Sequence, residues 1–142
     1  MKDFIEQEII RAVRELLAGW VNELLQDLLI HIPVIEFGDN YGNSSVVPVI
    51  ALSTCERSEK ERIIRQDAFS LTVTFTLQEH EDGELFCYAY SAAFEKALRE
   101  DITLGSIADR AVTTEKKYIP PKKPGCGEGW GLVLSARVTV ER

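Results

Sequence analysis

The chain has 142 residues, the size of one domain, of which 45% are hydrophobic and 27% charged. Its 16 basic and 23 acidic side chains give a formal charge of −7, which argues against wrapping of nucleic acid, because phosphate contacts need Lys and Arg. Apolar runs such as residues 28–30 are far too short to span a bilayer. We therefore expect neither a membrane partner nor a sequence-specific nucleic-acid partner.

The first 32 residues predict an amphipathic helix. Asp3 and Glu6 have the spacing of a capping box, and the helix is expected over residues 3–29. Its apolar stripe consists of Ile5, Ile9, Val13, Leu16, Trp20, Leu24 and Leu28, widened later by Leu17, Val21, Leu25 and Leu29. Gly19 predicts a bend or close packing, and Pro33 ends the helix at or before Ile32.

The next segment mixes strand and turn signals. Residues 33–37 predict a short edge strand, residues 38–45 a loop, and residues 46–52 a strand interrupted by Pro48. Residues 53–66 carry charges of both signs, so this stretch is either a solvated loop or a two-turn helix, and the sequence leaves both open.

Residues 67–105 form the best-patterned unit of the chain. Phe69, Leu71, Val73, Phe75 and Leu77 alternate with Ser and Thr, which predicts a strand with one buried face. An acidic turn over residues 79–83 leads into a helix over residues 84–100. The helix is expected to bury Phe86, Tyr90, Ala93, Phe94 and Ala97. The unit ends at Leu104 and Gly105.

The C-terminal third contains two further strands. The first is expected over residues 106–113, with Ile107, Ala111 and Val112 as core positions. Residues 114–123 contain Pro120 and Pro121 and predict an extended, projecting arm, followed by a glycine-rich turn over residues 125–129. In the last strand Leu132, Leu134, Ala136, Val138 and Val140 share one face.

This element order predicts an α+β fold in one domain over residues 1–142. An N-terminal helical part, residues 1–32, is followed by residues 33–142, which hold the sheet and the helix over residues 84–100. We expect an antiparallel or mixed sheet of four to five strands, with two main helices packed on one face.

No reactive constellation is evident, so we expect no catalytic residues, no metal site and no cofactor. The run from Gly125 to Gly131 lacks the Lys-Ser or Lys-Thr of a phosphate cradle and precedes a strand. His31 is expected at a helix C-terminus and His80 in a solvated turn. Cys55 and Cys126 lack an activating base, and Cys87 is expected to be a small buried hydrophobe; three isolated cysteines suggest a reducing compartment.

Charge is distributed unevenly along the chain. Residues 113–142 carry six basic and three acidic side chains, whereas residues 77–101 are strongly acidic. The candidate contacts between neighbouring copies are the basic Lys116, Lys117, Lys122 and Lys123 and the acidic Glu79, Glu81, Asp82 and Glu84. Two separately solvated charge clusters would give the same pattern.

Several dispersed segments carry a resemblance to a known family. They are residues 70–75, residues 88–93, Ala97 and Leu98 before residues 101–105, Lys117 with Tyr118, and residues 130–141. Over residues 46–141 the chain resembles the tail terminator or tail completion proteins of long-tailed bacteriophages and prophages. The long N-terminal helix departs from that pattern, because it is more apolar than a capping helix needs.

The resemblance implies a non-enzymatic virion protein that forms an oligomeric ring, typically a hexamer. Such a ring would cap the tail tube and join it to the head, so its partners would be its own copies, the tail tube protein and the head–tail connector proteins. It would be found in the host cytoplasm during assembly and then in the virion tail. The alternatives are another head–tail joining or tail-tube component, and a small soluble enzyme.

Overall fold

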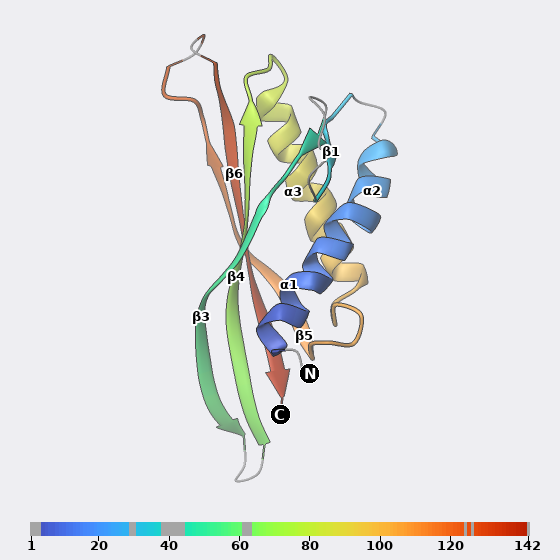
Figure 1. The fold of residues 1–142 in the computed structure, drawn as a ribbon, viewed down its shortest axis with the longest axis vertical. Helices are drawn as coiled ribbons and strands as arrows, with labels where there is room; N and C mark the ends of the chain where they lie inside the picture. The colour runs from blue at the N-terminus through green and yellow to red at the C-terminus, as the bar shows by residue number, and fades with distance from the viewer. Residues whose placement is uncertain are drawn as a thin grey trace.

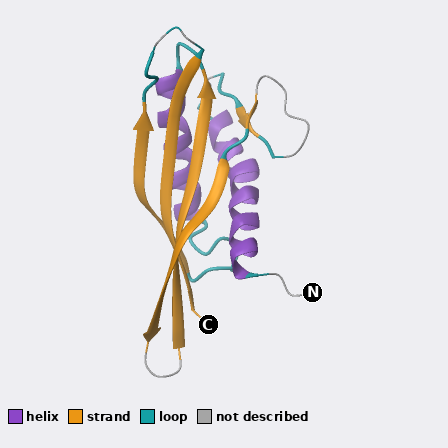
Figure 2. Ribbon diagram, turned by 60° about the vertical axis from the view of Figure 1, so that its left-hand side comes forward, coloured by secondary structure: helices purple, strands orange, loops and turns teal. Residues whose placement is uncertain are grey.

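The main sheet has four antiparallel strands in the order β3-β4-β6-β5, as seen in a computed structural model that describes residues 4–28, 31–37, 45–60, 64–123, 125 and 127–141. The strands are β3 (Val49–Lys60), β4 (Ile64–Gln78), β5 (Arg110–Ile119) and β6 (Glu128–Glu141). One long helix comprises α1 (Ile5–Leu16), a π-helical turn η1 (Leu17–Val21) and α2 (Asn22–Gln26), and the second helix is α3 (Gly83–Glu100). Both lie on the same face of the sheet (Figures 1 and 2). The fold is α+β, as the sequence predicted.

The core lies between this sheet face and the helices. The buried apolar side chains of β4 and β6 that face the helices are Phe69, Leu71, Val73, Phe75, Leu77, Leu132, Leu134, Ala136, Val138 and Val140. On α3 they include Phe86, Tyr90, Ala93, Phe94 and Ala97. Because alternate strand residues and every third or fourth helix residue point inward, the sequence patterns of these three elements are confirmed.

Tyr90 and Cys87 are two polar side chains of α3 that are buried in the core. The ring of Tyr90 stacks on Phe75 with centroids 4.8 Å apart, and its hydroxyl donates to the carbonyl oxygen of Pro33. Burial raises the pKa of Tyr90, and burial together with the nearby Glu84 carboxylate raises the pKa of Cys87 to about 11. Cys87 therefore stays a protonated thiol at neutral pH, as expected for a buried small hydrophobe.

The N-terminal helix is shorter than predicted. It begins after Phe4, whose backbone N–H donates to Oε1 of Gln7, so the cap is not the predicted Asp3, which lies outside the described residues. It ends at Gln26, well before His31, so the prediction of His31 at a helix C-terminus is wrong.

The π-helical turn changes which residues of this helix face the core. Ile9, Val13, Leu17, Val21 and Leu25 are buried at a constant spacing of four. That spacing would drift around an ordinary α-helix, and the wider turn at η1 offsets the drift. Trp20 and Leu28, which the sequence placed on the apolar stripe, are instead 40% and 48% exposed. A Cβ at Gly19 would meet no atom within 4 Å, so close packing is not the reason for this glycine.

The described residues of the segment 53–66, namely 53–60 and 64–66, are strand rather than loop or helix. The pairing of β3 with β4 runs from Val49 opposite Thr74 to Lys60 opposite Ile64, with one bulge after Leu52. The backbone ladder stabilises this hairpin, although the described side chains of residues 53–59 are all exposed.

The fifth strand begins and ends later than predicted. Leu104, Gly105 and Ser106 have φ values of 49°, 67° and 73°, and this left-handed run delays the strand to Arg110. The predicted arm over residues 114–123 is therefore strand as far as Ile119, and Pro120 and Pro121 begin the connection to β6. Val112, a predicted core residue, is 37% exposed on the face away from the helices.

The edge strand predicted over residues 33–37 lies outside the main sheet. It is β1 (Val34–Ile35), which pairs in parallel with β2 (Ser45–Val46), and the loop predicted between them falls mostly on residues 38–44, outside the described residues. Asn22 joins β1 to the helix, because its amide donates to the carbonyl of Ile35 at 2.8 Å and accepts from the Ile35 N–H at 2.9 Å. In the described part of the chain, no helix is long and apolar enough to cross a membrane.

Candidate assembly surfaces

The histidine and cysteine residues that the structure describes are not grouped into a metal site. His80 packs its ring against Phe86, with centroids 4.8 Å apart, and its Nδ1 accepts the backbone N–H of Asp82 at 2.9 Å. Cys55 is exposed on β3, Cys87 is buried on α3, and Cys126 lies outside the described residues. Among the residues that the structure describes, no three His, Cys, Asp or Glu side chains are placed to hold a metal ion.

The glycine-rich turn before β6 binds a carboxylate of the same chain. Gly125 and Gly127 have φ values of 88° and 81°, and their backbone N–H groups donate to the two carboxylate oxygens of Glu79 at 3.0 and 2.8 Å. Backbone amides that converge on one carboxylate in this way form a small anion-binding concavity. Glu79, a predicted contact residue, therefore links the β4–α3 turn to the β5–β6 connection at one end of the molecule.

The other acidic candidates lie around the same turn. Glu84 accepts the hydroxyl of Tyr88 at 2.6 Å, and this hydrogen bond is the main cause that raises the pKa of Tyr88. Glu81 and Asp82 are exposed. The exposed acidic candidates are thus concentrated at the β4–α3 turn, beside the β5–β6 connection of the same subunit (Figure 1).

The four predicted lysines divide between a strand and a loop. Lys116 and Lys117 lie on β5, where Lys116 forms an ion pair with Glu95 of α3 that lowers the pKa of that carboxyl. Lys117 pairs opposite Val133 and projects from the face without helices. Lys122 and Lys123 are exposed in the β5–β6 connection. Only these two lie in a projecting loop, as the sequence predicted for all four.

The second face of the sheet, here called the bare face, is covered by no helix in the described part of the chain (Figure 2). Its side chains on the two central strands include Ser70, Thr72, Thr74 and Thr76 of β4 and Val133, Ser135 and Arg137 of β6. Small polar and β-branched side chains suit a sheet surface that is wet in the free protein. This face extends across the four strands of the main sheet (Figure 2).

The outer strands of the sheet are β3 and β5, and on the outer side of β5 the N–H of Ala111 donates to the carbonyl oxygen of Ile102 at 2.7 Å. Within the described residues β3 pairs only with β4, and β5 pairs only with β6. Beside the outer edge of β5 lies a groove of about 520 Å³, here called the edge groove, between β5 and α3. Its lining includes Leu98, Arg99 and Ile102 on the helix side and residues 110–116 of β5. Unpaired strand edges are templates for pairing with another chain.

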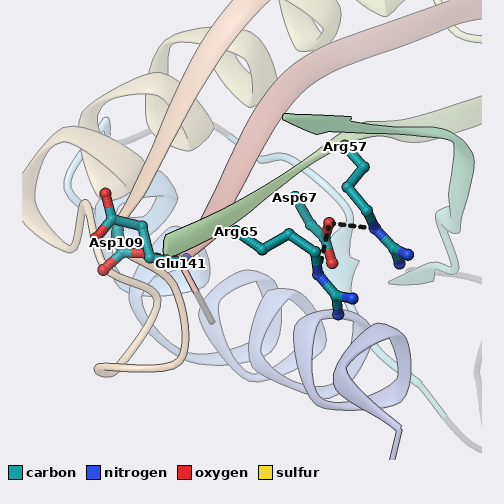
Figure 3. A network of polar contacts seen from close by, with 5 residues as sticks. All are labelled: Arg57, Arg65, Asp67, Asp109 and Glu141. Carbon is teal, nitrogen blue, oxygen red and sulfur yellow. Dashed lines mark hydrogen bonds and ion pairs between the residues drawn. The ribbon is translucent and has the colours of Figure 1, made fainter. Parts of the chain in front are cut away.

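The β3–β4 hairpin extends beyond the helices at the end opposite the acidic turn (Figure 1). At its base Asp67 is 2% exposed, and its Oδ1 accepts from Nε of Arg57 at 3.0 Å, with Nε of Arg65 at 3.8 Å (Figure 3). The two arginines come from opposite strands of the hairpin. This cluster stiffens the place where the hairpin leaves the helix-covered part of the sheet.

The two edges and the hairpin were not predicted as candidate surfaces. The contact residues were predicted from charge alone, and charged residues in the sequence indicated loops rather than strands. No protein-family model matches this chain, and no curated protein matches it either. The surfaces of the sheet are therefore the grounds on which a function can be argued.

Proposed function

We propose that this chain is a structural subunit of a bacteriophage or prophage tail, of the tail terminator or tail completion type. Copies would close into a ring, six-membered if the resemblance extends to stoichiometry, that caps the tail tube and joins it to the head. The proposed partners are further copies of this chain, the tail tube protein and the head–tail connector proteins. The proposed places are the host cytoplasm during assembly and the tail of the virion.

The observation that carries the proposal is the division of the sheet. One face is sealed by helices, while the bare face, both strand edges and a protruding hairpin are left for contacts. An assembling subunit needs such unpaired surfaces, because each copy must offer two different patches to its neighbours and a third to the tube. The sequence resemblance over residues 46–141 is the reason for proposing the phage tail as the place where the subunit assembles.

Open edges also suit the tail-tube alternative, in which copies polymerise without limit. The two roles differ in closure, because a heterologous contact gives a ring where the rotation closes and a filament where it does not. Purified protein imaged by electron microscopy separates them. We expect closed rings, or monomers that form one ring at one end of added tail tubes.

The experiment is to measure the mass of the protein by native mass spectrometry and image it with and without tail tubes. The proposal predicts one defined multiple of the subunit mass and density at one end of each tube, with tube growth stopped. Long filaments of the protein alone would favour the tube component. A monomer that never binds tubes would contradict both roles.

A further inference from the structure

We propose that neighbouring copies join edge to edge, with β5 of one subunit pairing antiparallel with β3 of the next, and that Arg110 and Glu56 meet across this seam. The inference rests on the proposed ring and specifies its contact. The occupant of the edge groove is accordingly a strand from a second copy of this chain.

The strand directions allow this arrangement. The sheet has four strands, all antiparallel to their neighbours, so its two outer strands run in opposite directions. A copy rotated about an axis parallel to the strands therefore brings its β3 antiparallel to β5. Every helix layer then lies on the same side, and the bare faces join into one surface. The contact is head to tail, so it can repeat around a ring.

The register follows from residues at the same level across the sheet. Glu56 pairs opposite Ala68, Ala68 opposite Thr139, and Thr139 opposite Arg110. Glu56 and Arg110 are thus level at the two outer edges. A neighbour placed without a shift along the strands sets Glu56 directly opposite Arg110, with both side chains exposed on the bare face. Within its own subunit Glu56 lies 3.8 Å from Arg137, a distance too long for a hydrogen bond, so its carboxylate can still accept from Arg110 of a neighbour.

A second row places an apolar side chain at the edge groove. Leu52 is level with Thr113, through Leu71 and Ala136, and this row points toward the helices. Leu52 is only partly buried at its own edge, and in the neighbour it would lie beside Leu98 of the edge groove. The buried Oγ1 of Thr113 has no hydrogen-bond partner within the described chain, and an incoming strand brings backbone groups next to it.

The edges also carry features that limit indiscriminate pairing. Each edge strand contains one bulge, after Leu52 in β3 and after Thr113 in β5, and several charged side chains. A matched opposite charge at one level makes one register more favourable than its alternatives, because like charges directly opposite each other repel. A twofold β5–β5 contact would instead place Arg110, Lys116 and Lys117 of both copies on one seam.

The test is a charge-swap series measured as ring formation, alone or on tail tubes. Arg110→Glu and Glu56→Arg should each lower association by about fivefold or more per contact, and the double variant should recover most of it. Lys117→Glu is the matched control, because this residue shares the strand and face of Arg110 but is level with the uncharged Val49. The melting temperature of each variant monomer shows that the fold is kept.

The outcomes separate the contact from the function. If wild-type rings form and neither reversal acts more than Lys117→Glu, the edge contact is wrong while the proposed ring stands. The edge contact is equally wrong if both reversals weaken assembly and the double variant recovers nothing. A twofold dimer that never forms a ring, or the absence of any assembly with tubes present, overturns the contact together with the proposed function.

Discussion

The two faces of the sheet are built from the same strands and differ in what covers them. On the helix side, the alternate residues of β4 and β6 are almost completely buried under α1 and α3, as Leu134 illustrates at 1% exposure. On the bare face, the intervening residues include Ser, Thr, Val and Arg, and Ser135 stands between two core residues. Folding free energy therefore comes mainly from one face, which leaves the other face and the edges to vary with the partners they meet.

The largest expected difference between the faces concerns core truncation. Leu134→Ala should lower the free energy of unfolding by about 2–5 kcal/mol, because it removes a buried side chain and leaves a cavity. Ser135→Ala, one residue along the same strand, should change it by about 0.5 kcal/mol or less. Chemical denaturation of the two variants measures the contrast. Equal losses would mean that the bare face also contributes substantially to folding.

The base of the hairpin should show an intermediate effect. Asp67→Asn keeps the shape of the side chain but removes the charge that the guanidinium groups of Arg57 and Arg65 face. We expect a loss of about 1–2 kcal/mol in a denaturation experiment, less than for a fully buried pair because both arginines reach solvent. The control is Glu59→Gln, an exposed residue of the same hairpin, which should have almost no effect. Unchanged stability of the Asp67→Asn variant would contradict the claim that this cluster stiffens the base of the hairpin.

The smallest effect is expected at the ion pair beside the edge groove. The hydrogen bond and charge of Lys116 lower the pKa of Glu95, so this pair stabilises the fold above the ordinary carboxyl pKa of 4.5, and the contribution is lost as pH falls through the lower folded pKa. Because the pair is partly exposed, we expect it to contribute about 0.5 kcal/mol to the free energy of unfolding. Unfolding measured from pH 7 to pH 3 should differ between wild type and Glu95→Gln only by this pH-dependent part. An identical pH profile would show that the pair contributes nothing.

The same contrast between the faces explains what could be predicted from the sequence. Apolar alternation and helical spacing identified the inner faces of β4, β6 and α3, because burial dictates residue type there. The outer half of β3 has no such pattern: from Ser53 to Glu59 every side chain is exposed, and only the backbone ladder makes it a strand. Pairing partners and edge positions are set by tertiary context, so charged residues on an edge strand look like a loop.

Two further errors have local causes. The left-handed backbone at Leu104 and Ser106 is rare for residues other than glycine, so no sequence signal showed that β5 starts only at Arg110. The π-helical turn rotates the last turns of the N-terminal helix and exposes Trp20, whose Nε1 donates to Glu100 at 2.7 Å instead of entering the core.

The predicted contact residues also divide by their surroundings. Lys117, Lys122 and Lys123 lie at the surface, where a partner could reach them. Glu79 is instead held by backbone amides within the subunit. Its charge suggested an outward contact, and only the positive φ values of Gly125 and Gly127 turn those amides toward it.

Amide hydrogen exchange of the free and the assembled protein tests the central claim most directly. In the free subunit the outward backbone N–H groups of β3 and β5 lack a partner strand and should exchange quickly, except that of Ala111, which donates to the carbonyl oxygen of Ile102. By contrast, β4 and β6 are protected by pairing on both sides. On assembly we predict that protection rises in residues 50–56 and 110–116 together, with little change in the central strands. Assembly that leaves both of these segments unprotected, with new protection confined to the loops around Glu81 and Lys122, would contradict the edge-to-edge contact.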